Sequence, residues 1–205
     1  MQVTIFQDDI SPEIAALLTR QDVVAWDIET SGLEWRRESI GTCQLYTEAT
    51  GAIVVQIGSG VPVYLSEVLT CPRVVKLFHH AMFDLRFMAN AWGVRPVNIS
   101  CTKVAAKLLW PTEASEWHSL RGLLHNRLGV TISKAQRVSD WMAEDLTLAQ
   151  LEYAIGDVVH LLELHKVLVK DMQERDILHL YQKCIEFLPS RVALEVGGWP
   201  DVFTY

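Results

Sequence analysis

The sequence predicts an α/β protein in which a sheet forms in the first half and helices dominate the second half. Short runs rich in β-branched residues occupy 23–30, 39–47 and 51–58, and turn residues separate them. From Cys101 onward, apolar residues recur at spacings of three and four, which is typical of amphipathic helices. A chain of 205 residues can bury a hydrophobic core, so we predict a single domain over 1–205.

In the first half, strands are expected to alternate with two helices. Ser11 and Pro12 are typical of a helix cap and a first helical residue, and this helix is expected to reach about Arg20. The order and spacing of the three strand-like runs favour antiparallel pairing. A further strand over 73–80 leads directly into a helical pattern that stops at Gly93.

The second half is expected to be mostly helical. Helices are predicted at 102–109, 117–128, 147–169 and 172–187, and the polar segment 133–141 is expected to form a loop between them.

Composition argues against a membrane or secreted protein. No apolar run reaches the ~20 residues that cross a bilayer, and the N-terminus lacks the basic and apolar stretches of a secretory signal. We therefore expect a cytoplasmic protein. The cysteines form no CxxC pair, so buried free thiols are expected rather than a zinc site or a disulfide framework. They are Cys43, Cys71, Cys101 and Cys184.

Three separated motifs carry carboxylates into apolar surroundings. Asp27 and Glu29 are two apart in a strand, so both point to one face, where their repulsion favours a bound cation over bare acids. Asp84 lies early in an apolar helix, and Tyr153 and Asp157 are four apart on a helical segment, so they share a face. Each motif also has a structural interpretation: a solvated strand end, a helix N-terminus, and a hydrogen bond at the edge of the core.

The order of these motifs resembles the tyrosine-containing branch of the DEDD exonuclease superfamily. The motifs read D-x-E-T from Asp27, H-x-x-x-F-D from His79 and Y-x-x-x-D from Tyr153. The resemblance implies an RNase H-like fold of the ribonuclease D type, with a mixed central sheet flanked by helices and a helical C-terminal half. It places the first motif on the first strand and the other two on helices.

Further segments resemble ribonuclease D-like enzymes, and in particular the nano-RNase C group. K-x-Q-x-x-S-D-W, from Lys134 to Trp141, looks like the loop that precedes the third motif, and CTKVAAKLL (101–109), EFLPSRVAL (186–194) and the GW-containing tail look like nano-RNase C. That group forms octameric rings and degrades very short RNA. The resemblance therefore implies a 3′–5′ exoribonuclease and a homo-oligomer.

The resemblance also implies two divalent cations, and a set of oxygen ligands without a Cys or His cluster favours Mg²⁺ or Mn²⁺. By analogy Asp27 bridges both cations, Asp157 completes the site of the attacking water, and Glu29 and Asp84 supply the remaining ligands. Tyr153 would orient the water. A phenol with a pKa of ~10 is a weak base, which favours positioning over full deprotonation.

Six residues are candidates for substrate contact. By resemblance Leu33 is an apolar wedge between the last two bases, although packing after a turn is an alternative. His80 departs from the His-Asn pair that ribonuclease D-like enzymes commonly carry, so its role is open. Trp141 is interpreted as a packing anchor. The six candidates are Thr30, Leu33, His79, His80, Gln136 and Ser139.

The net charge of −7 favours a short substrate, because grip on a long polyanion needs many Lys and Arg contacts. The apolar tail with Trp199, Val202, Phe203 and Tyr205 is typical of a contact with another subunit, although packing back on its own domain is an alternative. We therefore expect short single-stranded RNA as the substrate. Two alternatives stay open: an exonuclease on longer RNA, such as tRNA 3′ trimming, or on DNA, and a non-catalytic RNA-binding scaffold.

Overall fold

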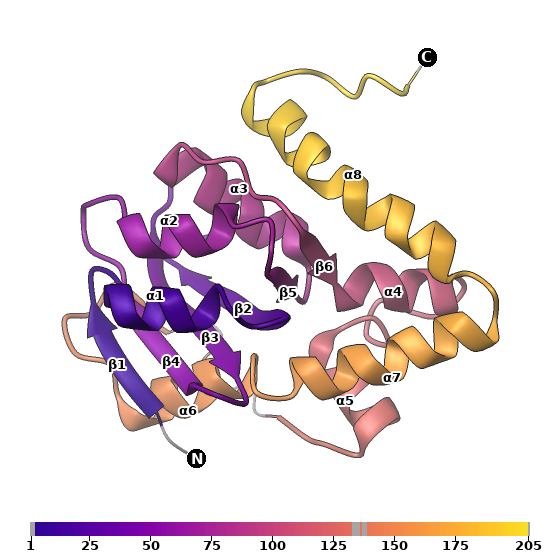
Figure 1. Ribbon diagram of the computed structural model, residues 1–205, viewed down its shortest axis with the longest axis horizontal. Coiled ribbons are helices and arrows are strands. Elements are labelled where there is room, and N and C mark those ends of the chain that lie inside the picture. Colours follow the sequence, from indigo (N-terminus) through magenta and orange to yellow (C-terminus); the bar gives the residue numbers. More distant parts are fainter. Residues whose placement is uncertain (1–2, 133–135, 137–138, 205) are drawn as a thin grey trace.

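The computed structural model describes residues 3–132, 136 and 139–204, and this part contains a six-stranded sheet in the order β1-β4-β3-β2-β5-β6 (Figure 1). β2, β3 and β4 pair antiparallel, as expected, whereas β1 is parallel to β4, and β5 and β6 continue parallel to β2. The sheet is therefore mixed. Its strands are β1 (Val3–Gln7), β2 (Val23–Thr30), β3 (Ile40–Thr47), β4 (Gly51–Gln56), β5 (Val75–Phe78) and β6 (Ile99–Cys101).

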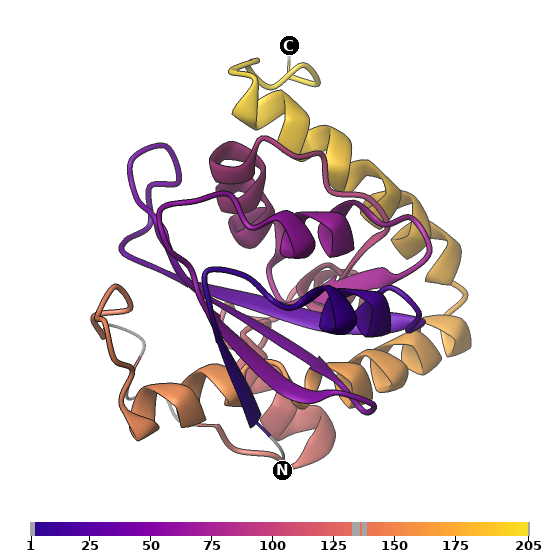
Figure 2. The ribbon, with the colours of Figure 1, turned by 60° about the vertical axis from the view of Figure 1, so that its left-hand side comes forward.

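Helices cover both faces of this sheet (Figure 2). α1, α2 and α3 pack on the face that carries Trp26, and α6 and α7 pack on the face that carries Ala25 and Val54. α4, α5, α7 and α8 share a second apolar core beyond β6. The helices are α1 (Pro12–Leu18), α2 (Val63–Thr70), α3 (Ala81–Trp92), α4 (Thr102–Leu109), α5 (Leu120–Leu128), α6 (Leu148–Gly156), α7 (Leu161–Glu174) and α8 (Leu178–Val196).

Local sequence signals set the ends of the helices that carry the candidate site. Thr147 and Gln150 form a reciprocal capping box at the start of α6. α3 ends at Gly93, whose φ of 66° is the left-handed conformation that glycine adopts without strain. The end at Gly93 was predicted from the sequence, whereas the start near residue 147 was predicted from apolar periodicity and not from this cap.

Three elements were not predicted, and one predicted helix is divided. β1, α2 and β6 are short, and the three residues of β6 are too few to show a periodicity. Because β1 precedes β2, the first carboxylate motif lies on the second strand of the chain. The expected helix over 147–169 ends at Gly156, whose helix propensity is ~1 kcal/mol worse than that of alanine, and α7 begins after a turn.

All four cysteines are free thiols, as expected. Cys43 and Cys101 are buried, but Cys71 and Cys184 are partly exposed, so the expectation of burial was wrong for these two. None of the described helices is long and apolar enough to span a membrane.

Candidate active site

The last half of β2 presents two carboxylates on one face of the sheet. Asp27 and Glu29 are partly buried, while Trp26 and Ile28 alternate with them and fill the core on the opposite face. The pairing of β2 with β3 shifts register between Glu29 and Thr30, which bends the strand where its acids emerge. The apolar core thus fixes the strand that holds both acids.

Asp157 joins this pair from the residue that follows α6. One carboxylate oxygen from each of Asp27, Glu29 and Asp157 can be chosen so that all three lie within 4.8 Å of one another. Oxygen ligands of Mg²⁺ and Ca²⁺ lie ~2.0–2.6 Å from the ion, so this spacing fits a divalent cation. The three acids therefore meet in space although 130 positions separate the first from the last.

Asp84 completes the acidic group from the first turn of α3. Its side chain is buried, at 2% exposure, and backbone N–H groups of Asp84 itself and of Ile28 stabilise its charged form. Burial, and then the charge of Asp157, nevertheless raise the pKa of Asp84 well above the usual range. The charge of Asp84 in turn raises the pKa of Asp27, so the carboxylates of this group repel one another.

Without cations this arrangement is electrostatically unfavourable. Burial, followed by the neighbouring charges, raises the pKa of Asp27, and the same causes raise the pKa of Glu29 to about 8. Burial raises the pKa of Asp157 to about 7, although a hydrogen bond from Tyr153 opposes this effect. Cations would relieve both desolvation and repulsion, which explains why a fold would gather four acids here.

Tyr153 lies one turn before Asp157 on α6 and donates its hydroxyl to that carboxylate. Burial, and then the charges of Asp157 and Glu29, raise the pKa of the phenol far above its ordinary value. The hydroxyl therefore stays protonated at neutral pH. This environment favours positioning of a water molecule over proton abstraction.

A buried tryptophan anchors the chain segment that precedes α6. Trp141 is 3% exposed, and its ring packs on Tyr153 with centroids 5.9 Å apart. Its carbonyl approaches β3 so closely that a Cβ on Gly41 would lie 2.3 Å from it, which requires glycine there. The interpretation of Trp141 as a packing anchor is thus confirmed, and the anchor helps to fix Tyr153.

Gln136 and Ser139 lie in the same segment and hydrogen-bond to each other. Gln136 lines a groove of ≈ 300 Å³ together with Tyr153 and Gly156. A Cβ on Gly156 would meet no atom within 4 Å, so the space beside this glycine is open to a ligand. Lys134, from the same motif, lies outside the described residues.

Thr30 is the last residue of β2, and Leu33 lies in the turn that follows. Leu33 is 82% exposed and lines a different groove, of ≈ 550 Å³, with Trp35, Arg86 and Trp199 among its other lining residues. Leu33 therefore does not pack against the hydrophobic core. The Thr30 hydroxyl donates to the Gly32 carbonyl at 2.6 Å and shapes the turn.

The two histidines before α3 differ in their surroundings. His79 Nδ1 lies 2.9 Å from Thr102 Oγ1, which ties the residue after β5 to the start of α4. Burial lowers the pKa of this imidazole to about 3, so it is neutral at physiological pH. His80 is exposed and has φ 71° and ψ 41°, a left-handed conformation that asparagine tolerates well. The backbone thus accounts for an asparagine at this position in ribonuclease D-like sequences.

Two residues of this region were missed in the sequence. Gln44 is buried on β3 directly across from Asp27, and its amide Nε2 donates to Thr42 Oγ1. Arg86, which lines the Leu33 groove, pairs with Glu195 at 3.1 Å. A polar residue within an apolar strand was the available signal for Gln44, whereas the partner of Arg86 is 109 residues away.

Comparison with known proteins agrees with this geometry. A family model described as a 3′–5′ exonuclease matches residues 2–173. The chain belongs to this family. Its fold is that of ribonuclease D, because the structure of Escherichia coli RNase D superposes with a TM-score of 0.80 at 21% identity, over 94% of this chain and 51% of that chain.

Two solved structures of greater sequence identity are similar over the whole chain. Brucella melitensis NrnC with bound Mg²⁺ has a TM-score of 0.90 and 33% identity, and the similarity covers 100% of both chains. The same protein bound to pGG has a TM-score of 0.89 and 33% identity, over 100% of this chain and 99% of that chain. Within the exonuclease family, this chain is therefore close to NrnC.

Ribonuclease D of Xanthomonas oryzae pv. oryzae is 32% identical over 144 residues, which cover 70% of this chain and 39% of the relative. Two further ribonucleases D are covered over 27% and 43% of their lengths. The chain thus spans less than half the length of these curated relatives.

Proposed function

We propose that this chain hydrolyses short single-stranded RNA from the 3′ end, down to dinucleotides, and releases nucleoside 5′-monophosphates. The observation that carries the proposal is the meeting of four carboxylates and one tyrosine at a single edge of the sheet. They are Asp27, Glu29, Asp84, Asp157 and Tyr153.

These carboxylates would hold two divalent cations, Mg²⁺ or Mn²⁺. When bound, the cations activate a water molecule and stabilise the charge that develops on the leaving oxygen. By family analogy Asp27, whose pKa the charges of the other three acids raise, would contribute to both cation sites. Tyr153 keeps its proton and orients the attacking water beside Asp157. The Mg²⁺-bound NrnC neighbour supports the binding of a divalent cation at this site.

Short RNA fits the charge and the grooves of the molecule. With a net charge of −7, the chain lacks the general electrostatic grip on which binding to a long strand depends. The Gln136 groove and the Leu33 groove offer contacts for individual nucleotides. Thr30, His79, His80 and Ser139 remain candidates for substrate contact, and the NrnC neighbour bound to pGG supports a short substrate.

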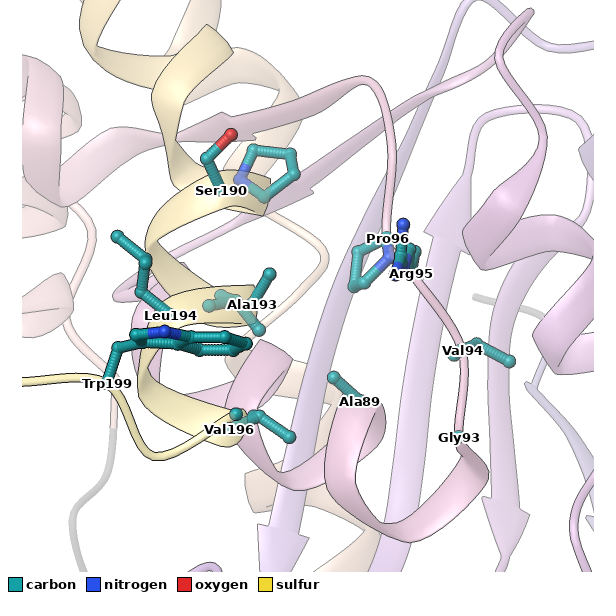
Figure 3. A pocket seen from close by; sticks show the side chains of 13 residues that line it. Ala89, Gly93, Val94, Arg95, Pro96, Ser190, Ala193, Leu194, Val196 and Trp199 are labelled. Atoms are coloured by element: carbon teal, nitrogen blue, oxygen red, sulfur yellow. The ribbon is translucent and has the colours of Figure 1, made fainter.

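A homo-oligomer, with an octamer by analogy, is part of the proposal. Trp199, Val202 and Phe203 are exposed beyond α8. Trp199 also borders an apolar pocket of ≈ 630 Å³ between α8 and the end of α3, which Figure 3 shows. Exposed apolar side chains beside an apolar pocket favour contact with another subunit. Tyr205 lies outside the described residues.

Substrate length is the test of this proposal. Labelled RNAs of two, five and twenty nucleotides are incubated with Mn²⁺, and the rate of release of mononucleotides is compared. Preference for the dinucleotide is the expected result. Equal or faster degradation of the longest RNA would favour the alternative of longer RNA, as in tRNA 3′ trimming, and the same test with DNA covers the other alternative.

If none of these substrates is cleaved, the result would favour a non-catalytic RNA-binding scaffold. Retention of four carboxylates and the tyrosine argues against it, because a binding role alone does not need a group of acids whose charges oppose one another.

A further inference from the structure

Two polar side chains are buried in the middle of the sheet, beside the carboxylate group. Gln44 and Thr42 belong to β3, and both side chains are fully buried. On the antiparallel neighbour β2, Asp27 lies directly opposite Gln44, and Glu29 lies directly opposite Thr42. Residues opposite each other in such a pair project to the same face, with Cβ atoms ~4.5–5.5 Å apart. Gln44 and Thr42 therefore face the same side of the sheet as the acids.

The helix α6 covers this face of the sheet, so bulk water does not reach the two side chains. Val54 of β4 is the other neighbour of Gln44, and it packs with Ile155 of α6 in one apolar cluster. The helix that carries Tyr153 thus closes over Gln44. A polar atom buried here costs free energy unless it finds a hydrogen-bond partner within the site.

One atom of the Gln44 amide lacks such a partner. Nε2 donates to Thr42 Oγ1, whereas no group in the described part of the chain donates to Oε1. Oε1 is an acceptor and requires a donor, but ionised carboxylates such as Asp27 only accept. The Tyr153 hydroxyl already donates to Asp157. The donor that Oε1 requires must therefore enter the site with a ligand.

We propose that Gln44 is a positioning residue whose Oε1 accepts a hydrogen bond from a water molecule on the cation beside Asp27. Mg²⁺ bound by carboxylates usually keeps several waters. Such waters donate hydrogen bonds outward, because their lone pairs point to the cation. The Thr42 hydroxyl holds the amide in the orientation that leaves Oε1 available. This inference rests on the proposed two-cation exonuclease site.

Mn²⁺ binding in the absence of RNA tests this role separately from catalysis. Gln44→Met keeps the length of the side chain and removes both polar atoms of the amide. We expect the Kd for Mn²⁺, measured from the electron paramagnetic resonance signal of the free ion, to rise about 10- to 100-fold. The melting temperature of the metal-free protein should stay at or above that of wild type, because an unpaired buried oxygen is removed. A packing defect would instead lower that melting temperature.

Three further variants isolate the role of Oε1. Gln44→Glu keeps an acceptor oxygen at the same reach, so it should bind Mn²⁺ at least as tightly as wild type. Thr42→Val keeps the shape of its side chain but removes the hydroxyl that holds the amide, so it should weaken Mn²⁺ binding in the same direction as Gln44→Met. Gln173→Met, at an exposed residue of α7, is the matched control and should change neither measurement. If Gln44→Met does not fold, the comparison of Gln44→Glu with Thr42→Val decides the question.

The outcomes separate this inference from the proposed function. An unchanged Kd for Gln44→Met overturns the inference, while wild-type binding shows that the cation site is intact. Loss of Mn²⁺ binding by Gln44→Glu would mean that the amide donor and not Oε1 is required, which also overturns it. If the wild-type protein binds no Mn²⁺, the proposed function fails, and the role of Gln44 fails with it.

Discussion

Asp84 contributes a buried carboxyl whose ionisation is disfavoured overall in the metal-free protein, despite two backbone hydrogen bonds. Its pKa is raised in the folded state, so the ionised side chain opposes folding at neutral pH. Asp84→Asn should therefore leave the melting temperature of the metal-free protein equal or higher. The same change should abolish turnover and the stabilisation that Mn²⁺ gives, because a ligand is lost.

Thermal melts with and without Mn²⁺, together with single-turnover assays, measure both effects. Glu67→Gln, an exposed acid on α2, is the matched control and should behave as wild type. Persistent cleavage by Asp84→Asn would contradict the assignment of Asp84 as a metal ligand.

Tyr153 is expected to position water without changing its protonation state. Tyr153→Phe keeps the ring that packs on Trp141 and removes only the hydroxyl. We expect kcat to fall by about 10- to 100-fold with little change in KM, which is the effect of losing a transition-state interaction. The pH dependence of kcat should keep its shape. Loss of an ionisation from that profile would show that the phenol acts as the base.

At the residue scale, the carboxylates could be predicted from the sequence, whereas most of the substrate contacts could not. The alternation in β2 and the four-residue spacing of Tyr153 and Asp157 are local, so they can be predicted from the sequence. The surroundings of His79 depend on Thr102, which belongs to another element. The ion pair of Arg86 depends on Glu195 in the same way. Such contacts leave no local pattern.

At the scale of elements, a buried lysine joins α2 to β5. Lys76 is fully buried, and its Nζ donates to the carbonyls of Cys71 at 2.6 Å and Val74 at 3.0 Å. Burial lowers its pKa from 10.5 to about 8. Between these values the unfolded chain binds more protons, so the free energy of unfolding should rise with pH from about 8 to about 10.

Lys76→Met should remove this rise while keeping most of the apolar volume. Urea unfolding at several pH values from neutral to alkaline measures it, and Lys170→Met, at an exposed lysine, is the control. Parallel pH profiles for wild type and Lys76→Met would mean that Lys76 does not titrate in this range.

Elements with strong local signals were predicted to within a few residues, as α3 and α4 show. The expected helix over 147–169 failed at Gly156 because apolar periodicity continues through the turn while the backbone does not. β6 is held by pairing with β5 and by Tyr181, which bonds Ser100 and Cys101. A strand defined by such partners cannot be found from three residues alone.

At the scale of the whole molecule, the order of the strands along the chain predicts only some of the pairings in the mixed sheet. Adjacent strands such as β2 and β3 are joined by short turns, which require antiparallel pairing. The parallel neighbours β1 and β4 lie almost fifty residues apart, so their pairing depends on the assembled core. For the same reason the four carboxylates could be expected to converge only through the resemblance to known exonucleases.

The C-terminal segment provides the test of assembly. Figure 1 shows it continuing beyond α8, where Phe203 contacts Phe187 with ring centroids 5.5 Å apart but stays 64% exposed. Trp199 is 60% exposed. Burial of such side chains between subunits stabilises association by roughly 1.5–3 kcal/mol each. Trp199→Ser and Phe203→Ser should therefore shift the protein toward smaller species, as measured by light scattering over a dilution series.

Val63→Ser is the control for a general loss of surface hydrophobicity. Val63 is exposed to a similar extent, at 61%, but lies at the start of α2. It should assemble as wild type does. A wild-type protein that remains monomeric at every concentration would refute the homo-oligomer, and unchanged assembly of both tail variants would place the interface elsewhere. Because the tail also borders the Leu33 groove through Trp199, dissociation should reduce activity on short RNA as well.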